Sequence, residues 1–376
     1  MLSAEQNNTL THVGPGTPTG QLLRSYWHPI AAGPAVAPGT VQAVRLLGEN
    51  LALFRTEDGE LGLVPARCPH RGASLALGFV EGQVLRCAYH GWAFDRSGMC
   101  VETPNEPAGS RLTELASTRS LPVLERGGLV FGHLGGTADP APGITALGPL
   151  ADPDAITVRI DVLPCNWLQI AENGMDPTHL EWLHGHFRNA QSRLRGAPEP
   201  FAVRPHDELA FEETPLGLVK RRRLVGESRD EAGEDWEIGQ QLIFPGILYH
   251  CSPSYRGMQF RTPIDDEHTL HIWWEGRDAD EPSVTVAPST TRRPDGSWDL
   301  DSIDGQDAVV WASQGSILDR TRERLGVADR GITMFRHMLF AEIARAADGL
   351  PPRNSDLVDV VDLPRRTATT AVLLPR

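Results

Sequence analysis

Short apolar runs separated by turn residues dominate the chain from residue 41 to residue 134. The stretch VQAVRLLGENLALFRTEDGELGLVPARC indicates three strands, with turns at Gly48-Glu49-Asn50 and at Glu57-Asp58-Gly59 between them. The same pattern continues in further short apolar runs, at residues 84–88, 92–95 and 129–133. Strands of this length with turn residues between them predict a small all-β domain over residues 41–134.

The segments on either side of this domain lack this alternation of short apolar runs and turns. Residues 1–40 mix turn residues with one short amphipathic piece at residues 20–27, and we expect them to pack on the second domain. Residues 135–155 form a connector rich in glycine and proline, which makes it the clearest domain boundary in the chain. We therefore expect the second domain to cover residues 156–376.

The second domain mixes strand-like and helix-like stretches. It opens with an apolar strand at residues 156–163, and a helix-compatible stretch follows at residues 165–185. Residues 196–215 resemble a loop, whereas further runs resemble strands, at residues 218–226, 239–250 and 268–276. Helical periodicity marks the last third of the chain, at residues 306–324 and 331–347. Strands followed by long helices predict an α+β domain.

Composition places the chain among ordinary globular proteins. Hydrophobic residues make up 40% and charged residues 22% of the 376 residues, a length that suits two domains. The formal net charge of −14 argues against a nucleic-acid partner, which would need clustered lysine and arginine. The first residues lack a basic start followed by an apolar stretch, and no apolar run approaches membrane-spanning length, so we expect a cytoplasmic protein without membrane contact.

One basic run stands out against this acidic background, Lys220-Arg221-Arg222-Arg223. Apolar residues precede and follow it, which is typical of an edge strand or of a strand that faces solvent. The alternative is a patch that binds a substrate or an electron-delivering partner. The sequence leaves both interpretations open.

The five cysteines are an odd number, and without an export signal a disulfide framework is not expected. Cys68-Pro-His70 and Cys87-Ala-Tyr-His90 instead place one thiolate and one imidazole on each of two tight loops. Four such ligands can hold a tetrahedral zinc ion, but zinc sites usually pair cysteine with cysteine and histidine with histidine. One ligand of each type per loop suits a two-iron cluster, in which one iron takes both cysteines and the other takes both histidines.

The neighbours of these four ligands also suit a cluster. Gly72 and Gly91 follow the histidines and predict turns that free backbone N–H groups to approach the sulfurs. Tyr89 and Trp92 offer an O–H donor and an aromatic shield. Histidine ligands are neutral whereas thiolates are anionic, so such a cluster has a raised reduction potential and accepts electrons readily.

A second candidate metal site lies in the segment ENGMDPTHLEWLHGH. Asp176-Pro177 is typical of a helix start, and His179 follows on the first turn. His184 lies about 140° round an ideal helix from His179, so both reach one metal only if the turn distorts or ends near Gly185. Two histidines and a carboxylate form the facial triad of non-haem Fe(II) oxygenases, although a histidine pair on such a helix is often only a surface or core feature.

The segments around the four cluster ligands resemble those of a known protein family. CPHRGASLALG followed by LRCAYHGWAFDRSGMC resembles the Rieske domain of aromatic-ring-hydroxylating oxygenases. The opening segment HVGPGTPTGQLLRSYWHPI is similar to the phthalate 4,5-dioxygenase group of oxygenase components, and the resemblance covers most of the chain. It implies an N-terminal all-β Rieske [2Fe–2S] domain and a C-terminal α+β catalytic domain, whose antiparallel sheet and helices hold mononuclear Fe(II).

The resemblance also implies roles for residues of the second site. The family motif D-x2-H-x4-H falls on Asp176, His179 and His184, so the two histidines are implied to bind the iron. The segment GQDAVVWASQGSILDRTRERLG looks like the family stretch that carries the third ligand, which matches Asp307, although a lone aspartate there is otherwise typical of a helix cap. Asp176 is implied to join His179 to a Rieske histidine of a neighbouring subunit, and His186 stays outside the metal shell.

Other residues are candidates for the pocket around the iron. Glu172 and Asn173 lie one turn before the iron-binding motif, where family members often carry an amide or an acid that faces the pocket. His250 is a candidate hydrogen-bonding partner of a substrate, although a core histidine explains it equally well. Gln169 and Trp311 are further candidates, although most such tryptophans simply belong to the core.

The chain shows no strand–GxGxxG–helix fingerprint for a dinucleotide, so electrons from NAD(P)H are expected to arrive through a separate reductase or ferredoxin. The resemblance implies a homotrimer with electron transfer across its interfaces, and an enzyme that uses O₂ on an aromatic substrate, with an aromatic carboxylate favoured. Dihydroxylation, monohydroxylation and oxidative demethylation use the same metals, so the reaction stays open. The alternative class is a Rieske electron-transfer or binding protein that lacks an active mononuclear site.

Overall fold

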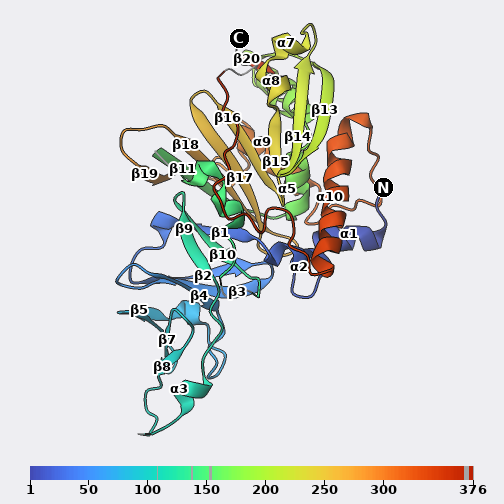
Figure 1. The fold of residues 1–376 in the computed structure, drawn as a ribbon. Coiled ribbons are helices and arrows are strands. Elements are labelled where there is room, and N and C mark those ends of the chain that lie inside the picture. The colour runs from blue at the N-terminus through green and yellow to red at the C-terminus, as the bar shows by residue number, and fades with distance from the viewer. Residues whose placement is uncertain (108, 137–138, 152–154, 368–371, 376) are drawn as a thin grey trace.

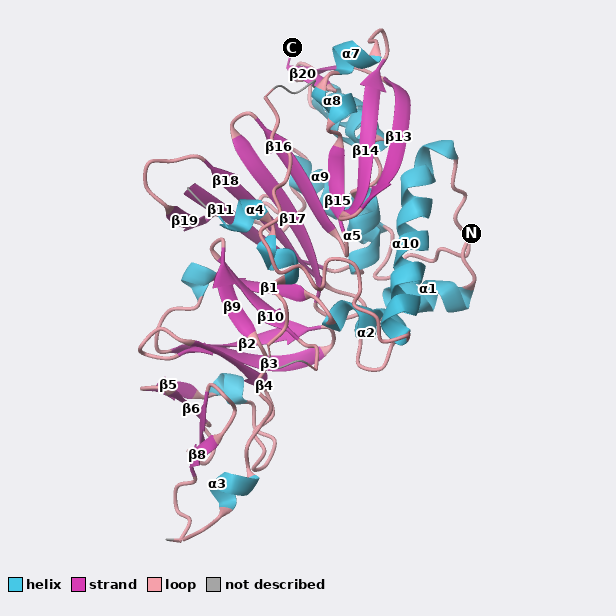
Figure 2. Ribbon diagram, in the orientation of Figure 1, coloured by secondary structure: helices cyan, strands magenta, loops and turns pink. Residues whose placement is uncertain are grey.

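The computed structural model describes residues 1–376 except 108, 137–138, 152–154, 368–371 and 376. Figure 1 shows a β-rich part built from the first third of the chain, and above it a large twisted sheet with helices built from the rest. Figure 2 shows that strands dominate both parts and that the long helices lie beside the large sheet. The expectation of an all-β N-terminal domain and an α+β C-terminal domain is confirmed.

The described residues of the β-rich part form small antiparallel sheets. One has the order β1-β10-β9, with strands Trp27–Ala32, Leu129–His133 and Val123–Arg126. Another has the order β2-β3-β4, with strands Thr40–Leu46, Glu49–Arg55 and Leu61–Pro65. A further one has the order β5-β6-β7-β8, with strands Phe79–Glu81, Val84–Arg86, Ala93–Asp95 and Cys100–Glu102. Short helices lie between them: η1 Gly33–Ala35, η2 Leu75–Leu77 and α3 Leu112–Leu115.

The turn between β2 and β3 shows how local sequence sets the register here. Leu46 pairs with Glu49, so the connecting loop consists of Leu47 and Gly48. Both have positive φ, 49° and 80°, which is the geometry of a two-residue type I′ hairpin turn. The turn predicted at residues 48–50 therefore lies too late in the chain, because Glu49 already belongs to β3.

The connector predicted at residues 135–155 is packed rather than exposed over residues 143–151, whereas residues 137–138 and 152–154 lie outside the described residues. It contains η3, Gly143–Ala146, and α4, Gly148–Ala151, and both are largely buried. The N–H of Gly148 donates to the carbonyl oxygen of Val361 at 2.7 Å, so the C-terminal tail covers this segment. The glycines and prolines that suggested a linker allow the backbone to approach its neighbours closely.

Within the described residues, the second part is built on an eight-stranded sheet of order β13-β14-β15-β16-β17-β18-β11-β19. Neighbouring strands are antiparallel except for β11 and β19. In sheet order the strands are His206–Thr214, Gly217–Leu224, Gln240–Ile243, Ile247–Ser252, Tyr255–Pro263, Thr269–Arg277, Ala155–Leu163 and Ser283–Val286. A separate pair consists of β12, Phe201–Val203, and β20, Leu373–Pro375.

The basic run lies on β14, which has β13 on one side and β15 on the other, so the edge-strand interpretation is wrong. On β13, Glu212 and Glu208 form ion pairs with Arg221 and Arg223 of the run. The loop expected at residues 196–215 is therefore wrong over β13, whose acidic residues neutralise the basic residues of β14.

Helices accompany the large sheet at its sides and ends (Figure 2). They are α5 Trp167–Asn173, the π-helix η4 Leu180–Phe187, α6 Arg188–Leu194, α7 Arg229–Ala232, α8 Glu234–Glu237, α9 Ile303–Ser313, η5 Val327–Asp329 and α10 Arg330–Ala347. The N-terminal helices α1, Ala4–Thr11, and α2, Pro18–Arg24, contact α10 beside the sheet, as Figure 1 shows. Among the described helices, none combines the length and apolar character that crossing a membrane requires.

The helix predicted over residues 306–324 is wrong in its second half. α9 ends at Ser313, and Gly315 follows with a φ of 92°, a conformation that ends helices. The chain then turns inward and buries Arg320 completely, at 0% exposure, beside Glu172. The helix predicted over residues 331–347 is confirmed by α10.

Candidate metal centres

The two cysteine–histidine loops have the same backbone geometry. In loop 68–73 and in loop 87–92, the cysteine N–H donates at 2.8 Å to the carbonyl oxygen five residues later. In both, the cysteine carbonyl accepts at 2.9 Å from the N–H of the glycine four residues later. Gly72 and Gly91 have φ of 75° and 74°, which favours glycine at these positions. Two matching turns thus present their ligands from facing loops.

The side chains of these loops form two pairs. Cys68 and Cys87 are buried, while the rings of His70 and His90 are partly exposed and lie 4.6 Å apart between centroids. Trp92 stacks on His70 at 4.3 Å, which provides the predicted aromatic shield.

This arrangement decides between zinc and a cluster. Tetrahedral zinc, with bonds of about 2.0–2.3 Å, would draw all four ligand atoms to within about 4 Å of one another. Among the described residues, the only group of three or more ligands within 4.8 Å lies elsewhere in the molecule. The separate cysteine and histidine pairs instead fit the two irons of a Rieske cluster.

The environment of the Cys68 sulfur agrees with the expectation that backbone N–H groups approach it. Backbone N–H groups of His70 and Arg71 reach the Cys68 sulfur, whereas the glycine N–H groups are used in closing the loops. Burial raises the pKa of the Cys68 thiol to about 11, despite these hydrogen bonds. The thiolate that a cluster requires therefore depends on the positive charge of bound iron.

The second candidate site lies on a distorted helix. Residues Leu180–Phe187 form a π-helix, in which hydrogen bonds join positions five apart. This distortion brings His179 and His184 to the same side, with ring centroids 5.3 Å apart. Gly185 does not end the helix; its role is close packing, because a Cβ there would lie 2.8 Å from the Val203 side chain.

Asp307 completes a group with the two histidines. One ligand atom from each of His179, His184 and Asp307 lies within 4.8 Å of the others. The Oδ1 atom of Asp307 lies 3.3 Å from Nε2 of His184, yet neither atom has a hydrogen-bonding partner among the described residues. Buried polar atoms without partners are rare, and here they converge, as the donor atoms of a mononuclear iron site would.

Gln306 fixes the orientation of His184, and the sequence analysis missed it. Its amide nitrogen donates to the carbonyl oxygen of Leu300 at 2.8 Å, so its Oε1 atom faces His184 and accepts from Nδ1 at 2.8 Å. With Nδ1 protonated, Nε2 keeps a lone pair for a metal, the usual arrangement of an outer hydrogen bond around a metal-binding histidine. The sequence feature that could have indicated this role is the position of Gln306 directly before Asp307.

Asp176 caps the helix that carries the two histidines. Its Oδ1 atom accepts hydrogen bonds from the N–H and the hydroxyl of Thr178, both at 2.7 Å, and its Oδ2 atom lies 3.6 Å from Nδ1 of His179. Burial opposes ionisation of this carboxyl, but the contacts with His179 and Thr178 prevail and hold its pKa well below the usual range. Asp176 is therefore an anion on the outer side of His179.

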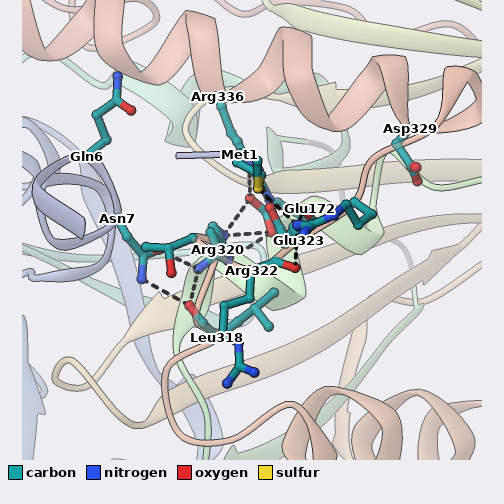
Figure 3. Close-up of polar contacts among 12 residues, drawn as sticks. Met1, Gln6, Asn7, Glu172, Leu318, Arg320, Arg322, Glu323, Asp329 and Arg336 are labelled. Atoms are coloured by element: carbon teal, nitrogen blue, oxygen red, sulfur yellow. Dashed lines mark hydrogen bonds and ion pairs between the residues drawn. The ribbon is translucent and has the colours of Figure 1, made fainter. Parts of the chain in front are cut away.

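Asn173 and Glu172 have different surroundings although they are adjacent in α5. Asn173 lines the cavity beside the metal group, with its Nδ2 atom 3.4 Å from Nε2 of His179. Glu172 points away from the cavity, and the expectation that it faces the iron pocket is wrong. Figure 3 shows it between Arg320 and Arg336, whose guanidinium groups donate to it at 2.8 Å and 2.6 Å.

Replacing Glu172 by glutamine is expected to lower the free energy of unfolding by about 3–5 kcal/mol, because the buried Arg320 loses its carboxylate partner and the buried Arg336 keeps only Glu323. Chemical denaturation measures this loss. The matched change Glu60→Gln removes an exposed partner of Arg96 and should cost less than about 1 kcal/mol. Equal losses for both variants would contradict a structural role for the buried cluster.

The same cluster predicts a pH dependence. Burial opposes ionisation of Glu172, but Arg320 and Arg336 outweigh it and lower its pKa below the ordinary value of 4.5. Its stabilising contribution is therefore complete above pH 4.5 and is lost as the pH falls through the lower pKa of the folded state. The stability difference between wild type and Glu172→Gln should shrink in acid.

A cavity of about 500 Å³ extends from the metal group to the large sheet. The metal-binding candidates, on η4 and α9 or beside them, form one side, and the sheet contributes Lys220, His250, Gln259 and Trp273. Gln169 and Trp311 do not line it: the Gln169 amide donates to the Trp311 carbonyl oxygen, so the expectation that they form the pocket is wrong.

His186 lies outside the metal group. It is exposed and packs against the Trp182 ring, with centroids 4.7 Å apart. His250 lines the cavity, and its buried Nε2 atom has no partner among the described residues. Gly257 makes room for it, because a Cβ there would lie 2.2 Å from the His250 ring.

Comparisons with known proteins agree with this geometry. The Rieske [2Fe-2S] domain family matches residues 26–122. The 5,5'-dehydrodivanillate O-demethylase oxygenase subunit of Sphingobium sp. (strain NBRC 103272 / SYK-6) is 38% identical over 94% of this chain and 83% of its own length. The phthalate 4,5-dioxygenase oxygenase subunit of Pseudomonas putida is 30% identical over 92% of this chain and 87% of its own.

The fold has counterparts among solved structures. The terminal oxygenase of carbazole 1,9a-dioxygenase from Nocardioides aromaticivorans IC177 superimposes with a TM-score of 0.64. The match covers 93% of this chain and 97% of that one, at 21% identity. The chain has a Rieske domain, two histidines that converge with an aspartate, and relatives of 30–38% identity that match over more than four fifths of their own length. It therefore belongs to the Rieske non-haem iron oxygenases, as a terminal oxygenase component.

Proposed function

We propose that this oxygenase removes methyl groups from methoxylated aromatic acids. The observation that carries the proposal is the convergence of His179, His184 and Asp307 at the edge of a cavity of about 500 Å³, which has room for an aromatic substrate. The choice of O-demethylation is supported by the relative of 38% identity, which is named an O-demethylase. Ring dihydroxylation is the alternative, in line with the relatives named dioxygenases.

His179, His184 and Asp307 would hold Fe(II), and Cys68, His70, Cys87 and His90 would hold the cluster. When bound, the cluster supplies electrons and the mononuclear iron supplies O₂ activation. The residues of the chain itself hold the two histidines in place: Gln306 orients His184, and Asn173 contacts His179.

Electron supply is proposed to come from a separate reductase or ferredoxin. Within one chain, the cluster loops belong to the small sheets at the lower end of Figure 1, far from η4 and α9. We propose a cyclic homotrimer in which Asp176 connects His179 to a Rieske histidine of a neighbouring subunit. Light scattering should then give a mass of three chains of 41.1 kDa. A monomer that is fully active would contradict this arrangement.

Product analysis tests the reaction. Each methoxy group removed should consume one O₂, two electrons and two protons, and yield one phenol, one formaldehyde and one water. The holoprotein is supplied with NADH, a ferredoxin reductase and ferredoxin, and a panel of methoxylated aromatic acids that includes 5,5'-dehydrodivanillate. Formaldehyde in equal amount to the phenol supports the proposal, whereas a cis-diol with the methoxy group intact contradicts it. An iron content of two rather than three per chain would favour an electron carrier.

A further inference from the structure

Gln259 presents a hydrogen-bond donor of fixed orientation to the cavity. The residue is 7% exposed and lines the cavity, and its Oε1 atom accepts a hydrogen bond of 2.8 Å from Nη2 of Arg261. A guanidinium can only donate, so Arg261 selects the amide oxygen and leaves the amide nitrogen of Gln259 to face away from it. The same arginine donates to the Gln259 carbonyl oxygen at 2.9 Å, which holds the pair together.

Trp273 places a second donor beside the first. It lies directly opposite Gln259 in the register of β17 and β18, so the two side chains share one face of the sheet. It also lines the cavity, and its buried indole nitrogen has no hydrogen-bonding partner among the described residues. An indole N–H only donates, so this atom requires an acceptor that the chain does not supply.

Lys220 contributes a positive charge with unused donors. The residue is 6% exposed, and its ammonium group donates to the carbonyl oxygen of Asp176 at 3.2 Å. No carboxylate of the described residues forms an ion pair with it, in contrast to its neighbour Arg221, which pairs with Glu212. Burial lowers the pKa of Lys220 to about 7, although the charges of Asp176 and Asp307 oppose this shift, and a further anion in the cavity would favour the charged form.

Several cations lie near His250 in this wall. Burial lowers the pKa of His250 to about 4, and the remaining causes are the charges of Arg261, Lys220, Arg159 and Arg366, all of them cations. His250 is therefore neutral. Arg159 and Arg366 have carboxylate partners in Asp304 and Asp235, whereas Lys220 has none among the described residues. A buried anion is stabilised most where hydrogen-bond donors and positive charges already face it, because these interactions offset the cost of removing the anion from water.

We propose that Lys220, Gln259 and Trp273 form a binding wall for the carboxylate of the aromatic substrate, and that Arg261 is the positioning residue that turns the Gln259 amide toward it. The metal group comes from the helices and the donors come from the sheet, so a ring bound in the cavity lies between them. This inference rests on the proposed function, since it names how that substrate is held.

Calorimetric titration of the oxidised holoprotein tests the wall without turnover. The probes are 5,5'-dehydrodivanillate and the same molecule with every carboxylate converted to a methyl ester. Charge-assisted hydrogen bonds favour the acid, so the wild type should bind it roughly 10–100-fold more tightly than the ester. Failure to bind the acid, or equal affinity for both probes, would overturn the proposal.

Two variants remove the donors while keeping the shape of the wall. Lys220→Met removes the charge, and Gln259→Glu replaces the amide donor by an acceptor while giving Arg261 a carboxylate partner. Both should lose most of the preference for the acid, with ester affinity within about threefold of wild type. Arg221→Met is the matched control: it removes one positive charge from the same strand, but Arg221 donates to Glu212 and to backbone carbonyls.

The outcomes separate this inference from the proposed function. Preference for the acid that survives in Lys220→Met and Gln259→Glu, or that is lost equally in Arg221→Met, contradicts the wall. A preference that depends on both residues, without formaldehyde from the bound acid, supports the wall and contradicts O-demethylation. Arg261→Lys offers a last check, since a lysine cannot hold both oxygens of Gln259 in the same way, and it should weaken acid binding less than Gln259→Glu.

Discussion

Replacing Asp307 by alanine is expected to abolish O₂-dependent turnover and to lower the iron content from three to two per chain. Asp307 is 6% exposed and supplies the carboxylate of the candidate triad, so its loss leaves two neutral histidines to hold a divalent cation. The cluster ligands lie on other loops, and the visible absorbance of the cluster should therefore be unchanged. Iron analysis, absorbance and product formation measure the three effects.

Asp301→Ala is the control for this change. Asp301 lies just before α9 and forms exposed ion pairs with Arg195 and Arg293, which contribute little to stability. The variant should keep its third iron and its turnover. If Asp307→Ala also retained the third iron, Asp307 would not be a ligand of the mononuclear site.

Replacing Asp176 by asparagine is expected to slow turnover by about 10–100-fold while the protein keeps both metal centres. Asparagine preserves an oxygen that can accept from Thr178, so the helix cap remains, but it removes the negative charge beside His179. The contact proposed to join the two centres across subunits is thereby weakened. The direct measurement is the rate at which the reduced cluster is reoxidised by O₂ and substrate.

Glu181→Gln is a suitable comparison. Glu181 lies on the same helix and accepts a hydrogen bond from the backbone N–H of His206, a contact that a glutamine oxygen can keep. Its cluster should be reoxidised at nearly the wild-type rate. An unchanged rate in Asp176→Asn would remove Asp176 from the electron path.

The elements that were predicted correctly can each be recognised from a short stretch of neighbouring residues. The loops at Cys68 and Cys87 need only a turn with a glycine of positive φ, and both glycines are visible in the sequence. The helix Arg330–Ala347 has a clear apolar periodicity. The strand His206–Thr214 was missed because its acidic residues pair with the next strand, a relation that a single segment does not reveal.

The predictions around the mononuclear metal site were wrong or undecided for the same reason: the contacts that matter join residues far apart in the sequence. Glu172 was expected in the pocket because it is adjacent to Asn173, but its partners Arg320 and Arg336 lie about 150 residues further along the chain. The ideal-helix angle left the convergence of His179 and His184 undecided, and a π-helix provides it. Such a distortion depends on what packs around the helix, which spacing alone does not determine.

The sequence by itself determined the ligand chemistry of this protein: two cysteine–histidine loops and a histidine pair close to an aspartate, each encoded within a turn or two of backbone. Only the tertiary structure decided how Asp307 joins the histidines, how Gln306 selects the protonated nitrogen of His184, and how Arg261 orients Gln259 in the cavity wall. The physical reason is the sequence distance over which each feature is determined. Ligand spacing is fixed by local backbone geometry, whereas the direction of a hydrogen bond between distant segments is fixed by the packing of the whole sheet against its helices.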